Sequence, residues 1–113
     1  MRYLLTIFLI SFTLLSCTQE EERPTDVLEF AKMVELVVDV EKVEAHLRTL
    51  NPEASLVIET KERYGMLLTK HGITQEEFKK SYNWWRAHPE QFENIYELAL
   101  AQLKSEEAEL KKR

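Results

Sequence analysis

Residues that break helices are scarce in this chain of 113 residues, and their positions set where its secondary structure can begin and end. Glycine occurs only at Gly65 and Gly72, and proline only at Pro24, Pro52 and Pro89. Alternating runs of β-branched residues, which are typical of strands, are absent. The sequence therefore predicts an all-α fold, a small bundle of three or four helices joined by short turns.

The first half of the domain predicts two helices. We expect Thr25 to cap a first helix that runs to about Leu50, where Asn51-Pro52 ends it. A second helix is expected from about Glu53 to His71, because Gly72 can adopt the left-handed conformation that closes a helix.

Two further helices are expected after Gly72. Thr74 and Glu77 form the sequence pattern of a capping box, which opens a third helix that breaks at His88-Pro89. Pro89 also suits the first turn of a fourth helix. The segment from Lys104 to Arg113 is so charged that we expect it to fray or to project into solvent.

Apolar residues recur at three- and four-residue steps in each segment, which predicts one buried face per helix. In the first two helices the expected faces comprise Val27, Phe30, Ala31, Val34, Val37, Val38, Val40, Val43 and Leu47, then Ala54, Val57, Ile58, Tyr64, Leu67 and Leu68. In the last two they comprise Phe78, Tyr82 and Trp85, then Phe92, Ile95, Tyr96, Ala99, Leu103 and Leu110.

The N-terminus has the layout of a secretory signal. A single basic residue, Arg2, precedes an uncharged and mostly apolar run from Leu4 to Leu15. The run is too short for a membrane-spanning helix, which needs roughly 20 apolar residues. Leu14-Leu15-Ser16-Cys17 resembles the lipobox, in which the cysteine becomes lipid-modified and then the mature N-terminus. We therefore expect residues 1–16 to be a cleaved lipoprotein signal peptide.

Cys17, the only cysteine, is the expected lipidation site. The thiolate is the side-chain nucleophile that can carry a thioether-linked diacylglycerol under mild conditions. One acyl chain gives only marginal membrane binding, whereas two or three, palmitate among them, hold a protein effectively permanently. In the alternative interpretation, Cys17 is an incidental residue of an ordinary signal peptide or of an uncleaved N-terminal helix.

Residues 17–24 form an acidic tether without an apolar stretch to bury. Glu20-Glu21-Glu22 resembles the short acidic signal that some Bacteroidetes lipoproteins carry beside the modified cysteine for export to the outer face of the outer membrane. The triplet is equally consistent with a solvated linker, which an anionic membrane would repel because both carry negative charge. Residues 25–113 are expected to form one helical domain, since they suffice for a single small core.

Charge and cysteine content argue against a nucleic-acid-binding protein and against a domain held together by disulfides. The formal net charge is −5, and cleavage before Cys17 would remove only one charged residue, the basic Arg2. Nucleic acid is not expected as a partner, because phosphate contacts need clustered cations. No second cysteine is present to form a disulfide within the chain, so the domain must rely on its packed core or on a partner.

Two segments resemble a known family. The stretch from His71 to Glu90, which continues to Gln91-Phe92-Glu93-Asn94-Ile95-Tyr96, is similar to the signature of small Bacteroidetes lipoproteins built on a helical domain of unknown function (domain of unknown function 4296). The stretch from Asp39 to Ala45 is similar to the first-helix pattern of that family, although Glu41 stands where histidine is expected and tryptophans 84 and 85 stand where tyrosines are commoner. The resemblance implies fold and location, here a lipid anchor in the outer membrane facing the periplasm or the cell surface, and it implies no activity.

The sequence indicates no catalytic, cofactor-binding or metal site, and we do not expect an enzyme. His46, His71 and His88 lack a carboxylate or second histidine three or four positions away on the same face. The acidic pairs Glu35 with Asp39 and Glu41 with Glu44 fit a solvated helix face better than acid–base chemistry. Lone serines at positions 81 and 105 have no histidine at a diagnostic spacing.

Trp84 is the residue most suited to contact another protein. If Trp85 joins the stripe of Phe78 and Tyr82, Trp84 points about 100° away and is partly exposed, and exposed aromatic anchors are enriched at interaction sites. The alternative is that Trp84 covers the turn around Pro89 or packs under another helix. Taken together, these features predict a lipid-anchored envelope module that binds or scaffolds another envelope protein. One alternative is an accessory subunit of a transport or assembly complex. Another is an envelope enzyme or metal-binding protein with a site assembled across helices.

Overall fold

The structure, a computed structural model, describes residues 22–50 and 55–112. These residues form four helices and no strand: α2 (Phe30–Arg48), α3 (Ser55–His71), α4 (Gln75–Arg86) and α5 (Pro89–Lys111). The predicted all-α fold of a small bundle is confirmed. The expected signal peptide, the lipidation site Cys17, the break at Asn51-Pro52 and the start of the second helix at Glu53 lie outside the described residues.

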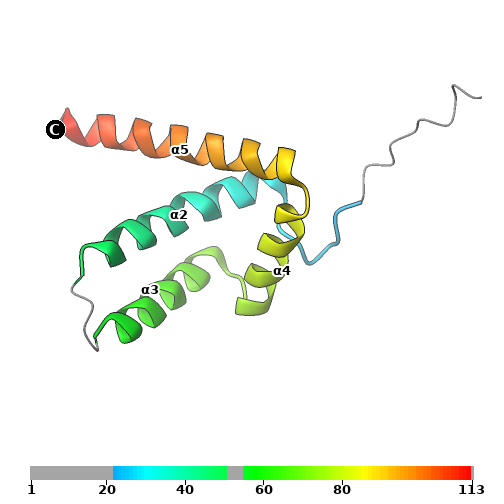
Figure 1. The fold of residues 1–113 in the computed structure, drawn as a ribbon, viewed down its shortest axis with the longest axis horizontal. Coiled ribbons are helices and arrows are strands. Elements are labelled where there is room, and N and C mark those ends of the chain that lie inside the picture. The colour runs from blue at the N-terminus through cyan, green and yellow to red at the C-terminus, as the bar shows by residue number, and fades with distance from the viewer. Residues whose placement is uncertain (1–21, 51–54, 113) are drawn as a thin grey trace, which may run out of the picture.

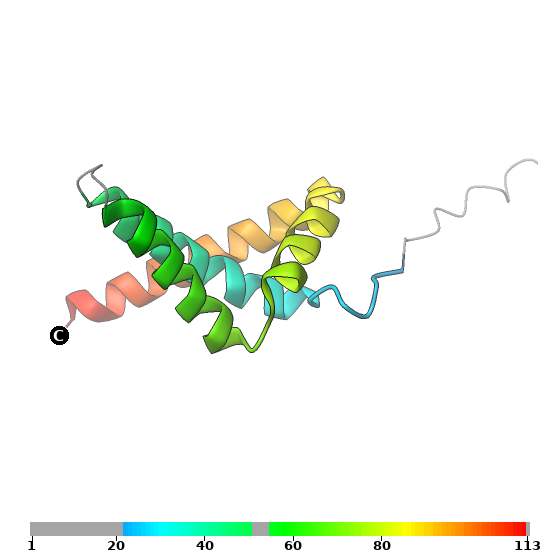
Figure 2. The same ribbon diagram turned by 90° about the horizontal axis from the view of Figure 1, so that it is seen from below.

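Helix α2 occupies the middle of the domain. Figure 1 shows α5 on one side of it and α3 on the other, with α4 crossing the end at which α2 begins. From below, α5 crosses behind α2 while α3 runs in front of it (Figure 2). Because α2 packs against both neighbours, it is buried over a wide part of its circumference.

The buried residues of α2 differ from those expected. Met33 and Leu36 are fully buried, as are Val37 and Val38, whereas Ala31 is exposed. The single face drawn from the periodicity therefore omitted two core residues and included a wrong one. The reason is that α2 packs against helices on two sides, so that its buried arc is wider than the stripe of a surface helix.

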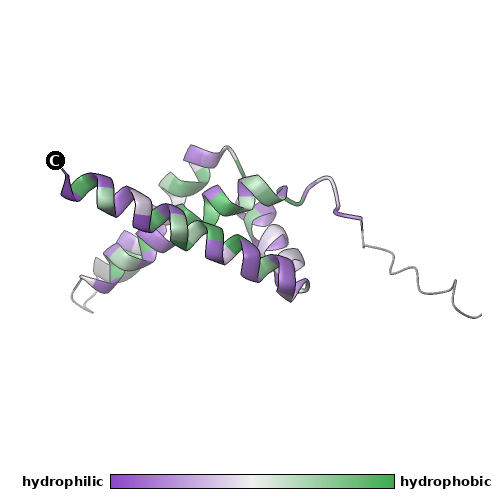
Figure 3. Ribbon diagram, turned by 90° about the horizontal axis from the view of Figure 1, so that it is seen from above, coloured by the Kyte–Doolittle hydropathy of each residue, from purple (hydrophilic) through white to green (hydrophobic). Residues whose placement is uncertain are grey.

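On α3 and α5, the expected apolar faces were too broad. Val57 and Ile58 of α3 are 76% and 62% exposed, and Tyr96 and Leu110 of α5 are also exposed. Leu67 of α3 and Ile95 and Ala99 of α5 are buried as predicted. Each of these helices packs on α2 along one side only, so apolar residues outside that side face solvent; Figure 3 shows apolar segments gathered where the helices cross.

The chain before α2 is not helical, so the prediction that Thr25 caps the first helix is wrong. Residues 25–27 form a turn, and α2 begins four residues later than expected, with Glu29 in place of Thr25 as its N-cap. The backbone of Leu28 is bound to α4 instead: its N–H donates to Ser81 Oγ at 3.0 Å, and its carbonyl accepts from Trp85 Nε1 at 2.9 Å. These two bonds stabilise a non-helical backbone at Leu28.

The connection between α3 and α4 follows the prediction. Gly72 has a φ of 62°, the left-handed conformation expected of a residue that closes a helix. The capping box is formed, with Glu77 N 3.1 Å from Thr74 Oγ1 and Thr74 N 3.4 Å from Glu77 Oε1. Local sequence alone sets this turn.

The charged end of α5 stays helical to Lys111, so it does not fray, but nearly all its side chains from Lys104 on are exposed, as the alternative of projection into solvent predicted. Glu106 Oε2 lies 2.8 Å from Lys42 Nζ, which ties this part of α5 to α2. None of the helices described is long and apolar enough to cross a membrane.

We predict that Ser81→Ala destabilises the domain by about 1–3 kcal/mol, because it leaves the Leu28 N–H buried without an acceptor. Chemical denaturation followed by tryptophan fluorescence measures this change. Ser105→Ala, on the exposed surface of α5, is the matched control and should change stability by less than about 0.5 kcal/mol. Equal effects of the two substitutions would contradict the role given to Ser81.

Candidate functional site

Trp84 is half-buried on α4 and packs on its own neighbours. Its ring stacks on that of His88 with centroids 4.0 Å apart and an interplanar angle of 29°, and it meets the ring of Trp85 edge-on at 4.8 Å. This is the packing expected of a tryptophan that covers the turn before Pro89. Its role as a protein contact stays a prediction.

An ion pair that the sequence analysis missed joins α3 to α2. His71 Nε2 lies 2.7 Å from Asp39 Oδ2, and Lys70 Nζ lies 2.8 Å from the same oxygen. The side chains of His71 and Asp39 are only 10% and 14% exposed. Because the two residues are far apart in the sequence, a search for partners three or four positions from each histidine cannot find them.

The charges around Asp39 fix its protonation state. Burial by itself would raise the pKa of Asp39, but the hydrogen bonds from Lys70 and His71 outweigh it and lower the pKa below the usual value. The carboxylate is therefore ionised at neutral pH. Within residues 22–50 and 55–112, no three histidine, cysteine, aspartate or glutamate side chains are grouped to hold a metal ion, and we interpret the Asp39 cluster as a structural tie.

A row of aromatic rings crosses three helices on another part of the domain. The rings of Tyr64 on α3 and Phe78 on α4 have centroids 6.1 Å apart, those of Phe78 and Tyr82 4.9 Å, and those of Tyr82 and Phe92 on α5 6.2 Å. We call these four residues the aromatic row. All four residues were expected on buried helix faces, but helix periodicity does not predict that they form a continuous row.

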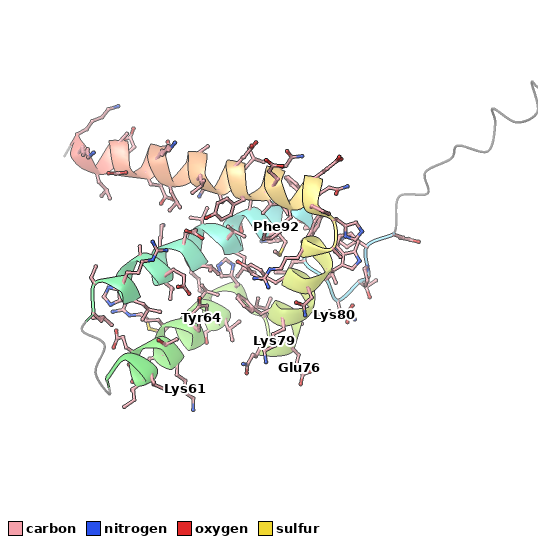
Figure 4. The ribbon with its side chains drawn as sticks, viewed as in Figure 1. Lys61, Tyr64, Glu76, Lys79, Lys80 and Phe92 are labelled. Atoms are coloured by element: carbon pink, nitrogen blue, oxygen red, sulfur yellow. The ribbon has the colours of Figure 1, made fainter. Side chains whose placement is uncertain are left out.

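A concave site lies against this row, between α2, α3 and α4. It is a hollow of about 270 Å³, which we call the aromatic hollow. Helix α4 supplies most of its lining, and the other two helices supply the remainder: Phe78, Lys79, Tyr82, Asn83 and Arg86 from α4, Val40 and Glu44 from α2, and Tyr64 from α3. Figure 4 shows Tyr64 on the side of α3 that faces α2, and Lys79 on the side of α4 that faces α3.

A second hollow of about 440 Å³ continues from the first along α5. Arg86 lines both hollows, and Phe92 and Tyr96 line the second together with Glu93 and Glu97. The two hollows form one surface that involves all four helices. Concave surfaces lined by aromatic and polar side chains are typical of binding sites.

The tyrosines of the site are donors and not bases. Burial and the hydrogen bond to the Glu44 carboxylate raise the pKa of Tyr64, and burial raises that of Tyr82. Both hydroxyls therefore keep their protons at physiological pH. Tyr96 donates in the same way to Glu41 Oε1 at 3.4 Å, so two carboxylates of α2 hold tyrosines in place.

Two cations of α4 face the aromatic hollow. Lys79 and Arg86 are exposed, and neither forms an ion pair with any carboxylate in the described part of the chain. The Arg86 guanidinium lies over the ring of Tyr82, 5.1 Å from its centroid. Trp84 points away from Lys79 and Arg86, because the five residues from Lys79 turn a helix through about 500° and the two to Arg86 through about 200°; it lies about 100° from Asn83 and lines neither hollow.

The comparisons with known proteins identify one family. The model of a family described as a domain of unknown function, DUF4296, matches residues 24–109. This confirms the resemblance to domain of unknown function 4296. No curated protein and no solved structure matches the chain.

We predict that Asp39→Asn destabilises the domain at pH 7 by about 1–3 kcal/mol, because the nearly buried His71 loses its charged acceptor. A lowered folded pKa contributes stability above the unfolded pKa, and this contribution is lost as the pH falls through the folded value. The deficit of the variant should therefore shrink below about pH 4.

Denaturation across a pH series tests this expectation. Asp26→Asn is the control, since Asp26 pairs with Lys80 at a half-exposed site and its loss should matter less. A deficit of Asp39→Asn that is independent of pH would contradict the ion pair.

Proposed function

The chain belongs to the DUF4296 family, a domain of unknown function, and we propose that it is a lipid-anchored helical module of the cell envelope that binds another envelope protein. The observation that carries this proposal is the aromatic hollow. Tyr82 is buried, and Tyr64 and Phe78 are half-buried. These three rings belong to the packed interior and also line a concave surface. Aromatic walls with hydrogen-bonding groups are what protein-binding sites use as anchors.

The chemistry of the hollow favours binding over catalysis. The Tyr64 hydroxyl is protonated and already donates to Glu44, so the carboxylate that the described residues contribute to the aromatic hollow has a hydrogen-bond partner. The remaining polar side chains, Lys79, Asn83 and Arg86, are exposed and can contact a partner without a rearrangement of the core. Such a set recognises a surface and provides no paired acid and base.

The anchor in this proposal is Cys17, and the tether is formed by residues 17–24. The described domain begins to fold back on itself at Pro24, whose carbonyl accepts from Val27 N at 3.2 Å. The tether would hold the hollow close to the outer membrane, where partners are other envelope proteins. The domain would then act by proximity, since anchoring raises the effective concentration of a partner in the same membrane.

We predict that the full-length protein, crosslinked in intact cells and purified, carries one stoichiometric partner. Asn83→Tyr should abolish this partner, because a bulky uncharged ring at an exposed position fills the mouth of the hollow without disturbing the core. The measurement is quantitative mass spectrometry of the crosslinked complex. Protease treatment of the cells beforehand shows which membrane face carries the domain.

Trp84→Ala is the control because Trp84 is on the same helix but lines neither hollow. Retention of the partner by this variant and its loss in Asn83→Tyr would support the hollow as the contact. Loss in Trp84→Ala alone would move the contact to Trp84, and the absence of a stoichiometric partner in the wild type would refute the proposal.

For the anchor, we predict that Cys17→Ser yields an unlipidated protein that leaves the membrane fraction, because a serine hydroxyl does not form the thioether. Intact-mass measurement of the purified protein and fractionation of the cells test this. A wild-type mass that shows no acyl chains would refute the anchor while leaving the binding site untouched.

A further inference from the structure

We propose that the aromatic hollow binds an acidic peptide segment, with Lys79 and Arg86 contacting its carboxylates. This inference rests on the proposed function and names the chemistry of the partner. It is carried by two cations that form no ion pair within the described residues and lie beside an aromatic wall, in a chain whose formal net charge is −5.

The cations of α4 differ in their surroundings. Lys80 forms an ion pair with Asp26 on the side of α4 that faces the N-terminal segment. Its neighbour Lys79, and Arg86 two turns further on, face the hollow and have no carboxylate partner within the described residues. Acidic side chains are abundant in this protein, so cations without one are available for a ligand.

The spacing of the two cations sets the spacing of the ligand's charges. Seven residues along a helix bring Lys79 and Arg86 to the same face about 10 Å apart. A peptide in the polyproline II conformation advances about 3.1 Å per residue with three residues per turn, so two carboxylates three positions apart lie on one face about 9 Å apart and match this distance. Asn83 lies between the cations and can both donate to and accept from the peptide backbone.

The carboxylates of the protein itself indicate where the acidic groups of the peptide bind. Of the residues that the structure describes, Glu44 is the only carboxylate that lines the aromatic hollow, and it already accepts a hydrogen bond from Tyr64. Glu93 and Glu97 line the second hollow, where they would repel a carboxylate. The acidic residues of the peptide therefore occupy the aromatic hollow, and an uncharged part of the peptide follows along α5.

A peptide fits this site better than a sugar or a bilayer does. Sugars stack on free aromatic faces, but the face of Tyr82 is covered by the Arg86 guanidinium, and its ring meets that of Phe78 at 4.9 Å. A bilayer surface is flat on this scale, whereas the cations border a recess between three helices. Peptide recognition uses such recesses, with pockets for side chains and polar groups for the backbone.

The test selects random decapeptides, displayed on messenger RNA, against the full-length protein purified in detergent. We expect the enriched sequences to carry two acidic residues three positions apart. Lys79→Glu combined with Arg86→Glu should weaken the dissociation constant of the best synthetic peptide at least about tenfold. The same variant should bind better a version of the peptide with lysine at the two acidic positions.

Lys61→Glu combined with Lys104→Glu is the matched control, because it makes the same change in net charge at two exposed positions outside the hollow. Figure 4 shows Lys61 on the outer side of α3. This control should bind the peptide as the wild type does. Enriched peptides without acidic residues, or equal losses in the two double variants, would overturn the inference.

Two further measurements separate this inference from its alternatives. Vesicles containing phosphatidylglycerol serve as the membrane probe. If Lys79→Glu combined with Arg86→Glu abolishes vesicle binding and leaves peptide binding unchanged, the two cations bind lipid and the acidic-peptide inference is refuted. If the crosslinked partner is lost in Asn83→Tyr but kept in this double variant, the proposed function stands and the acidic peptide is refuted. If the wild type has no partner in cells, the proposed function is refuted, whatever the peptide selection shows.

Discussion

Burial of α2 between α3 and α5 is the interaction on which the rest of the domain depends. Met33 and Leu36 have no exposed surface, and both neighbouring helices pack on α2. No second cysteine exists that could form a disulfide within the chain, so the packing of this helix provides stability that other small domains gain from disulfides. The hydrogen bonds that attach Leu28 to α4 place the start of α2, and with it the position of the whole helix.

The aromatic hollow is a consequence of that arrangement. Helix α4 crosses the end of α2, so Phe78 and Tyr82 face toward α2 and α3 and form one wall. The rings of Tyr64 and Phe92 extend this wall onto α3 and α5. This hollow needs no loop, since side chains of α2, α3 and α4 line it, and rigid helices hold side chains more precisely than loops do.

Some of this architecture could be predicted from local sequence. The capping box at Thr74 and the left-handed Gly72 were predicted correctly, because each depends on residues within a few positions of each other. The cap at Thr25 was predicted wrongly, since Ser81 and Trp85, more than fifty residues away, bind the backbone of Leu28. Helix periodicity also failed on α3, where Val57 and Ile58 face solvent.

By itself, the sequence determined the helical class, the turn from α3 to α4 and the resemblance to the family, because these depend on neighbouring residues and on a recognisable pattern. Only the tertiary structure decided that Asp39 pairs with His71, that the aromatic row spans three helices, and that Lys79 and Arg86 border a hollow. Contacts between distant residues depend on how helices cross, and a one-dimensional pattern of apolar residues does not contain the crossing geometry.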